Sequence, residues 1–197
     1  MKYAKKNHAM ISAAVLAIVA TAAAGCSRLS DTTAPTSSPP RTGGPDSLTD
    51  SSQVGSLLRS GITQMEQKKW SAAATSLQKV LAINPGNIYA NYDLGVIAQT
   101  AGHSSEAISY YDKALAADAA YTPAMYNEAI LLESSDPQRA IAMYQKIVRI
   151  NPRAATAYLR LALVQDEQGD ITAAEADDAK AVKIDPALRK YKLPAKS

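Results

Sequence analysis

Apolar side chains recur at helical spacing through the C-terminal part of the chain. In residues 88–121, Ala90 and Leu94 fall on one stripe, and Ala107 and Tyr111 fall on a second stripe further along. Apolar positions three or four residues apart predict an amphipathic helix, so this segment predicts two helices of about 12–15 residues each. Glycine, proline, asparagine and aspartate cluster between such stretches and predict the turns that separate them.

The two-helix pattern repeats along the chain. Small residues recur at a nearly constant interval in one column, which consists of Ala73, Ala107, Ala140 and Ala174. A second column precedes the first within each unit, keeps the same interval and consists of Gly61, Gly95, Ala129 and Ala162. The two columns are 12 residues apart in three units and 11 apart between Ala129 and Ala140. The missing residue falls in residues 133–137, which predict a turn. Small residues in register predict helices in close contact, and stacked pairs supply the core that one pair cannot form alone.

These columns resemble those of the tetratricopeptide repeat family. The clearest unit contains Leu94, Gly95, Ala107, Tyr111 and Ala114. Asp178 departs from the pattern, because it stands where the last unit would carry an aromatic residue. The resemblance covers residues 53–187, with units at about 54–87, 88–121, 122–154 and 155–187. It implies an all-α fold, a right-handed superhelix of about four antiparallel helix pairs.

Residues 1–25 predict a targeting signal that does not belong to the fold. Lys2, Lys5 and Lys6 precede an apolar run over residues 9–24, which is shorter than the roughly 20 residues of a membrane-spanning helix. The run leads to Cys26 in a sequence that resembles the lipobox of bacterial lipoproteins, with alanine where that family prefers leucine. The resemblance implies cleavage before Cys26 and attachment of lipid to its thiol. The alternatives are cleavage by ordinary signal peptidase, which releases a soluble protein, and an uncut signal anchor.

The segments at both ends of the repeat region differ from it in composition. Residues 26–52 predict a flexible linker attached to the lipid, because 18 of the 26 residues from 27 to 52 are serine, threonine, proline or glycine. Random-coil scaling gives this linker a mean reach of roughly 25–30 Å. Residues 188–197 predict a short basic tail.

Charge and composition exclude several classes of function. The formal net charge of +3 comes from the N-terminal lysines, because 18 basic and 18 acidic side chains remain from Cys26 onward. A nucleic-acid-binding protein usually carries a basic stripe, and we expect no nucleic-acid partner. Cys26 is the only cysteine and there are two histidines, so we expect no metal site. The sequence lacks a phosphate-binding loop, GxSxG and HExxH, and we expect no enzyme activity, cofactor or small-molecule substrate.

The first helix of each pair supplies the candidate binding residues. In the tetratricopeptide repeat family these helices line a concave groove that holds a peptide or helix of another protein, and the resemblance implies the same here. Tyrosine suits such a groove because it offers rigid contact area and a hydroxyl group. Inner positions of the groove could instead belong partly to the core. The candidate residues are Tyr89, Tyr92, Asp93, Val96, Tyr126, Asn127, Ile130, Leu159 and Arg160.

One well-known subclass of the family grips the terminal carboxylate of a peptide with lysine, asparagine and arginine. The corresponding positions in this chain supply no cation, and Asp93 would repel a carboxylate. We therefore expect the groove to hold an apolar or mixed segment.

The sequence predicts a non-enzymatic scaffold or adaptor that is lipid-anchored to the bacterial cell envelope and faces the periplasm or the exterior. Its partners would be a protein or peptide in the groove and the membrane through the anchor. The alternatives are a secreted or signal-anchored regulator or assembly factor of an envelope complex, and a structural homo-oligomer.

Overall fold

The computed structural model describes residues 46–191 and residue 193. The predicted signal, Cys26 and the linker up to residue 45 lie outside the described residues. The chain divides into two units, residues 1–52 and 53–197, and the second unit contains the helical repeats from residue 53 onward. Among the described residues, none of the helices combines the length and the apolar character that a membrane span requires.

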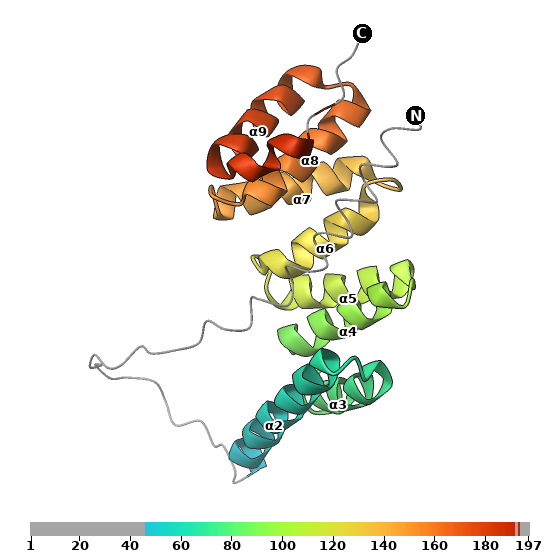
Figure 1. Ribbon diagram of the computed structural model, residues 1–197. Helices are drawn as coiled ribbons and strands as arrows, with labels where there is room; N and C mark the ends of the chain where they lie inside the picture. Colours follow the sequence, from blue (N-terminus) through green and yellow to red (C-terminus); the bar gives the residue numbers. More distant parts are fainter. Residues whose placement is uncertain (1–45, 192, 194–197) are drawn as a thin grey trace, which may run out of the picture. The chain divides into compact units, whose positions relative to one another are not determined.

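The described residues form helices that follow one another along a stack (Figure 1). The α-helices are α2 (Asp46–Glu66), α3 (Trp70–Ile83), α4 (Ile88–Thr100), α5 (Ser104–Ala117), α6 (Thr122–Leu132), α7 (Pro137–Ile150), α8 (Ala155–Gln168) and α9 (Ile171–Ile184). A 3-10 helix, η2 (Pro186–Tyr191), follows α9. We call α2, α4, α6 and α8 the first helices and α3, α5, α7 and α9 the second helices. This all-α series of four helix pairs confirms the predicted fold class.

The small columns lie where the two helices of a pair meet. The four alanines of the second helices, Ala73, Ala107, Ala140 and Ala174, have no exposed surface. A Cβ atom added at Gly95 would lie 2.7 Å from Cδ1 of Tyr111 and still closer to Cε1 of the same ring. The missing side chain at Gly95 therefore sets how closely α4 approaches α5.

The core is shared between neighbouring pairs. One cluster joins α3 and α4 through Leu77, Val80, Ala90 and Leu94, with residues of α2 packed against it. A second cluster joins α4, α5 and α6, and a third joins α6, α7 and α8. Because each cluster draws on two successive pairs, each pair depends on its neighbour for burial of its apolar face.

Both ends of the helical region extend beyond the predicted repeats. α2 begins at Asp46, so the end of the predicted linker is helical. Residues 50–53 are exposed, and backbone hydrogen bonds rather than burial support this turn of helix. At the other end, η2 includes part of the predicted tail, and Leu188 is buried there. The apolar side chain of Leu188 explains why this charged segment is helical next to α9.

The turns within the pairs follow the same register as the helices. Gly102 and Gly169 adopt the left-handed backbone conformation, with φ of 82° and 86°. Lys68 stands at the place of Gly102 in the first pair and takes the same conformation, with φ of 57°. In the third pair, which has the shorter separation between columns, the turn between α6 and α7 contains no residue with positive φ.

We expect Gly95→Ala to destabilise the protein by about 1–3 kcal/mol, because its Cβ would overlap the buried Tyr111 ring. Chemical denaturation followed by circular dichroism measures this loss. The matched control is Gly55→Ala, where the nearest atom is 3.6 Å away at the flexible end of Arg59. There the helix preference of alanine should stabilise by about 0.5–1 kcal/mol. Equal effects at both glycines would contradict the close approach of α4 and α5.

Candidate protein-binding face

The predicted groove residues lie on three first helices, and the structure separates them by exposure. Tyr89 exposes 57% of its surface. The half-buried residues are Tyr92, Asp93, Val96, Tyr126 and Ile130. The buried residues are Asn127, Leu159 and Arg160, with 6%, 2% and 1% exposed. We call the surface formed by Tyr89 and the five half-buried residues the first-helix face.

Several residues of this face also contact the core. Tyr92 and Val96 pack against the cluster shared by α4, α5 and α6. Tyr126 and Ile130 pack against the cluster shared by α6, α7 and α8. Their positions are therefore fixed by packing, which pre-organises the surface that they present.

Three tyrosine rings form an aromatic group at the α4 end of the face. The ring of Tyr121 lies 6.0 Å from that of Tyr89 and 5.4 Å from that of Tyr92, both in edge-to-face geometry. This arrangement is favourable for aromatic pairs. Tyr121 was not predicted as a site residue, because it directly precedes α6 and gives no helical signal of its own. The signal that could have identified it is one more tyrosine next to the tyrosine-rich first helices.

Asn127 joins two helix pairs through hydroxyl groups. Its side-chain Nδ2 donates to Tyr92 Oη at 3.3 Å and to Tyr111 Oη at 3.5 Å. The hydroxyl of Tyr111 in turn donates to Gln99 Oε1 at 2.6 Å. Burial raises the pKa of Tyr92 to about 12, so its hydroxyl stays protonated at neutral pH. The groups that form these hydrogen bonds between the second and third pairs are uncharged.

The next junction uses charged groups at the same places. Arg160 forms an ion pair with Glu133, with 2.9 Å between Nε and Oε1. The hydroxyl of Tyr144 donates to the same Glu133 oxygen at 2.7 Å. Arg160 thus occupies the place of Asn127, and Glu133 that of Gln99. The ion pair holds Arg160 inside the fold between the third and fourth pairs.

The first junction has apolar side chains instead. Leu58 and Leu77 stand one repeat before Tyr92 and Tyr111 and pack together in the core cluster of α2, α3 and α4. Asp93 stands one repeat before Asn127. Burial raises the pKa of Asp93 from its ordinary value of 3.8 to about 7. Leucine side chains have no hydrogen-bond donor, so they cannot stabilise the ionised carboxyl and lower its pKa.

A separate charged network lies between α5, α6 and α7. Arg139 pairs with Asp112 at 2.6 Å and with Glu128. Burial, followed by the charge of Asp112, raises the pKa of Glu128 to about 7, although Arg139 opposes this shift. These residues were not predicted from the sequence as site residues. Their contacts join neighbouring pairs and give the network a structural role.

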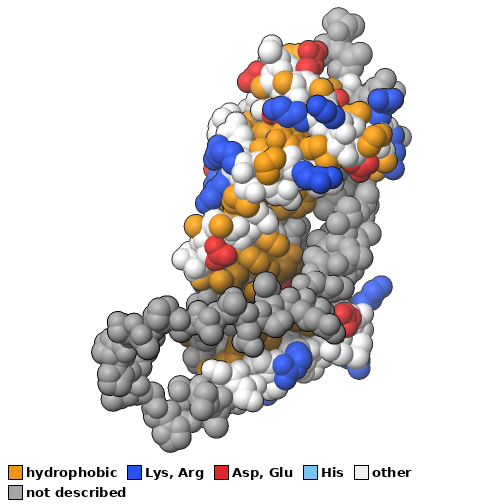
Figure 2. All heavy atoms as spheres, turned by 90° about the vertical axis from the view of Figure 1, so that its left-hand side faces the viewer, with side chains coloured by type: hydrophobic (Ala, Val, Ile, Leu, Met, Phe, Trp, Pro, Cys, Tyr) orange, Lys and Arg blue, Asp and Glu red, His pale blue; other side chains and the backbone are white. Residues whose placement is uncertain are grey.

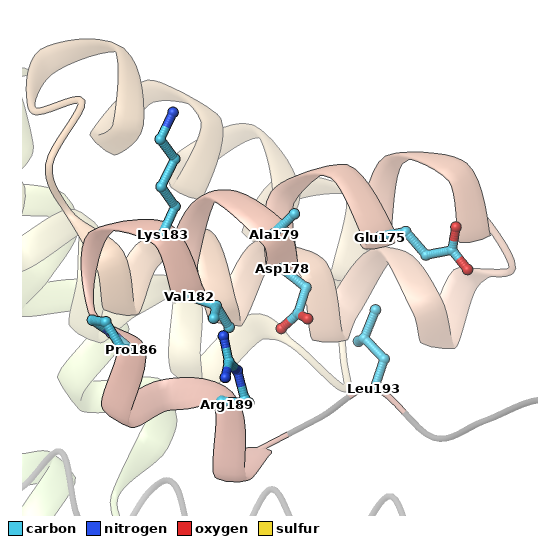
Figure 3. A pocket seen from close by; sticks show the side chains of 8 residues that line it. All are labelled: Glu175, Asp178, Ala179, Val182, Lys183, Pro186, Arg189 and Leu193. Atoms are coloured by element: carbon cyan, nitrogen blue, oxygen red, sulfur yellow. The ribbon is translucent and has the colours of Figure 1, made fainter.

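Figure 2 shows one side of the molecule, where hydrophobic side chains gather in the middle and lysine and arginine side chains are most frequent toward the α9 end. A hollow next to α9 and η2 (Figure 3) is lined by Glu175, Asp178, Ala179, Val182, Lys183, Pro186, Arg189 and Leu193. Its charges are of both signs and select no ligand class. The described residues contain no group of three or more side chains that could hold a metal ion.

Two family models described as "Tetratricopeptide repeat" match the chain, one over residues 64–127 and the other over residues 130–188. Together they span the helix pairs from the end of α2 to η2. The chain belongs to the tetratricopeptide repeat family. The repeat pattern visible in the two columns of small residues is therefore that of a known family.

The repeat region is also similar to curated proteins of very different length. The TPR repeat-containing protein MJ1428 of Methanocaldococcus jannaschii is 26% identical over 117 residues, which cover 58% of this chain and 20% of that protein. The photosystem I assembly protein Ycf3 of a Synechococcus species is 30% identical over 120 residues, with 57% and 69% covered. A probable tomato peptide N-acetylglucosaminyltransferase, SPINDLY, is 35% identical over 83 residues, which are 9% of that protein.

Solved tetratricopeptide repeat structures share the fold. A crystal structure of MamA has a TM-score of 0.64 at 26% identity and covers 73% of this chain and 85% of that one. YrrB, described as "a TPR protein with an unusual peptide-binding site", has a TM-score of 0.61 at 20% identity, with 73% and 77% covered. These likenesses establish the repeat architecture on which the first-helix face is built.

We expect the stability of this repeat protein to depend on the ionisation of Asp93. Its carboxyl ionises near its ordinary pKa in the unfolded chain but only near pH 7 in the folded one, so folding loses stability as the pH rises between these values. Asp93→Asn should therefore unfold at a higher temperature than the parent at about pH 8 and at the same temperature at about pH 4.

Thermal unfolding followed by circular dichroism across this pH range makes the comparison. Glu128 also has a raised pKa, but it is present in both proteins, and the difference between them isolates Asp93. A temperature difference that stays constant from low to high pH would contradict the burial of the Asp93 carboxylate.

Proposed function

We propose that this chain is a non-enzymatic scaffold that binds a protein segment on its first-helix face and is tethered to the bacterial cell envelope through a lipid on Cys26. The observation that carries the binding role is the aromatic group of Tyr89, Tyr92 and Tyr121. It combines an exposed ring with two rings held by packing. Rigid aromatic side chains of this kind contribute much of the energy at protein interfaces.

The chemistry of the face favours binding over catalysis. Burial raises the pKa of the Tyr92 and Tyr121 hydroxyls, so they stay protonated and are poor nucleophiles. The pKa of Asp93 is raised by burial, and none of the hydrogen bonds and ion pairs of the described residues joins it to a nucleophile. These groups are suited to contact and hydrogen bonding with a partner.

The names of the similar proteins agree with a binding role. YrrB is described by its peptide-binding site, and Ycf3 by its part in assembly. SPINDLY is named as a transferase, but this chain spans only 9% of it. The matched part common to these proteins is the repeat region, which supports a partner-binding function for the repeats themselves.

The envelope tether rests on the sequence before the repeats. The lysines, the apolar run and Cys26 stand in the order of a bacterial lipoprotein signal. The following segment is rich in serine, threonine and proline and would separate the repeats from the membrane surface. This arrangement would present the first-helix face to envelope proteins.

We expect Tyr89→Ala to reduce partner capture from envelope extracts at least several-fold, because the exposed ring is lost while the core is untouched. Quantitative pull-down with the full chain in detergent measures the change. The matched control is Ile150→Ala, which truncates another exposed hydrophobic side chain, on the second helix α7. Equal capture by the Tyr89 variant and the parent would contradict partner binding on the first-helix face.

We expect Cys26→Ala to abolish lipid labelling and to release the protein from membranes, because the variant lacks the thiol that carries the lipid. Metabolic labelling with a fatty-acid analogue and membrane fractionation measure both effects. Membrane retention of the variant without label would instead indicate an uncut signal anchor. A soluble, unlabelled parent protein would indicate ordinary signal peptidase cleavage.

A further inference from the structure

The residues at equivalent positions of the three junctions between helix pairs can be compared directly. The same register position of the first helix holds Asp93, Asn127 and Arg160 in successive pairs. Asn127 donates to hydroxyl groups of the preceding pair, and Arg160 forms an ion pair with a carboxylate of the preceding pair. At two of the three junctions, the fold itself supplies the polar partner.

Asp93 differs from its two equivalents because the residues of the preceding pair at the equivalent places are apolar. The side chains in the places of the two tyrosines are Leu58 and Leu77, which have no hydrogen-bonding group. A half-buried carboxylate without a compensating partner disfavours the ionised form and costs stability. The chain keeps an acidic group at this place, and such exceptions often mark functional positions.

The surroundings of Asp93 suit a positively charged side chain. Asp93 directly follows Tyr92 on α4, and the ring of Tyr92 lies 5.4 Å from that of Tyr121. Tyr89 extends the same aromatic group to the exposed surface. Tyrosine rings attract lysine and arginine through cation–π interaction and cover the aliphatic part of these side chains.

We propose that Asp93 anchors a lysine or arginine side chain of the partner segment, whose aliphatic part packs on the neighbouring tyrosine rings. This inference rests on the proposed function, because it specifies the chemistry of the partner on the first-helix face. A cation at this place would supply the ion pair that Arg160 and Glu133 make within the fold at the last junction. The anchor also favours a basic residue over an acidic one, which the carboxylate would repel.

Selection from a random peptide library displayed on phage tests the inference with the full chain in detergent as bait. The parent protein should select peptides with lysine or arginine at one fixed position of the aligned sequences. Asp93→Asn, which keeps the size of the side chain, should lose this preference. Asp93→Lys should select aspartate or glutamate at that position. The matched control is Glu106→Gln, which removes one negative charge from an exposed site on α5 and should select as the parent does.

A synthetic peptide from the parent selection gives the quantitative test. Replacing its basic residue with norleucine should weaken binding to the parent by about 10-fold to 100-fold in fluorescence anisotropy. The same replacement should have little effect on binding to Asp93→Asn, because the anchor is already absent. The Asp93→Asn variant should fold as the parent does, and circular dichroism verifies this.

The outcomes separate this inference from the proposed function. Selected peptides without a fixed basic position, or with that position retained by Asp93→Asn, would overturn the anchor but leave the first-helix face as a binding surface. Peptides whose binding is unaffected by Tyr89→Ala would overturn the first-helix face as well. Failure to select any peptide would count against both.

Discussion

The contact between a small residue on a first helix and a large side chain on its second helix controls the rest of the structure. Gly95 leaves room for the ring of Tyr111, and Gly61 leaves room for Leu77 in the same way. This close approach lets each pair present a fixed apolar surface to the next, and the core clusters form only across pairs. Because every pair depends on its neighbours, the stack should behave as a chain of nearest-neighbour interactions.

The polar groups between the pairs follow the same geometry with different chemistry. An amide donates to two hydroxyls at one junction. At the next, one carboxylate pairs with a guanidinium and accepts from a hydroxyl. Asp93 has the equivalent position, and leucines stand in the places of the two hydroxyl-bearing residues. Repeats that diverge at such positions can stabilise some junctions and leave another free to contact a partner.

This division explains how a stable stack can also be a specific binding surface. Tyr92 and Val96 are held by the core and so lose little conformational entropy when a partner binds. Tyr89 extends from the same helix into solvent and is free to make the first contact. Pre-organised rings beside a single carboxylate would distinguish partners by charge as well as by apolar area.

The sequence alone determined the repeat length, the columns of small residues, the turn that contains the shorter interval and the family. These features depend on local helical spacing, which repeats visibly along the chain. It also placed Tyr89 and Asp93 on first helices. Only the tertiary structure decided which of those residues are accessible: Asn127, Leu159 and Arg160 carry the right register but are buried. The burial of a side chain and its hydrogen-bond partners depend on residues of other repeats. Packing between pairs therefore sets which hydroxyls bind Asn127. It also sets which side chains stand at the equivalent places near Asp93.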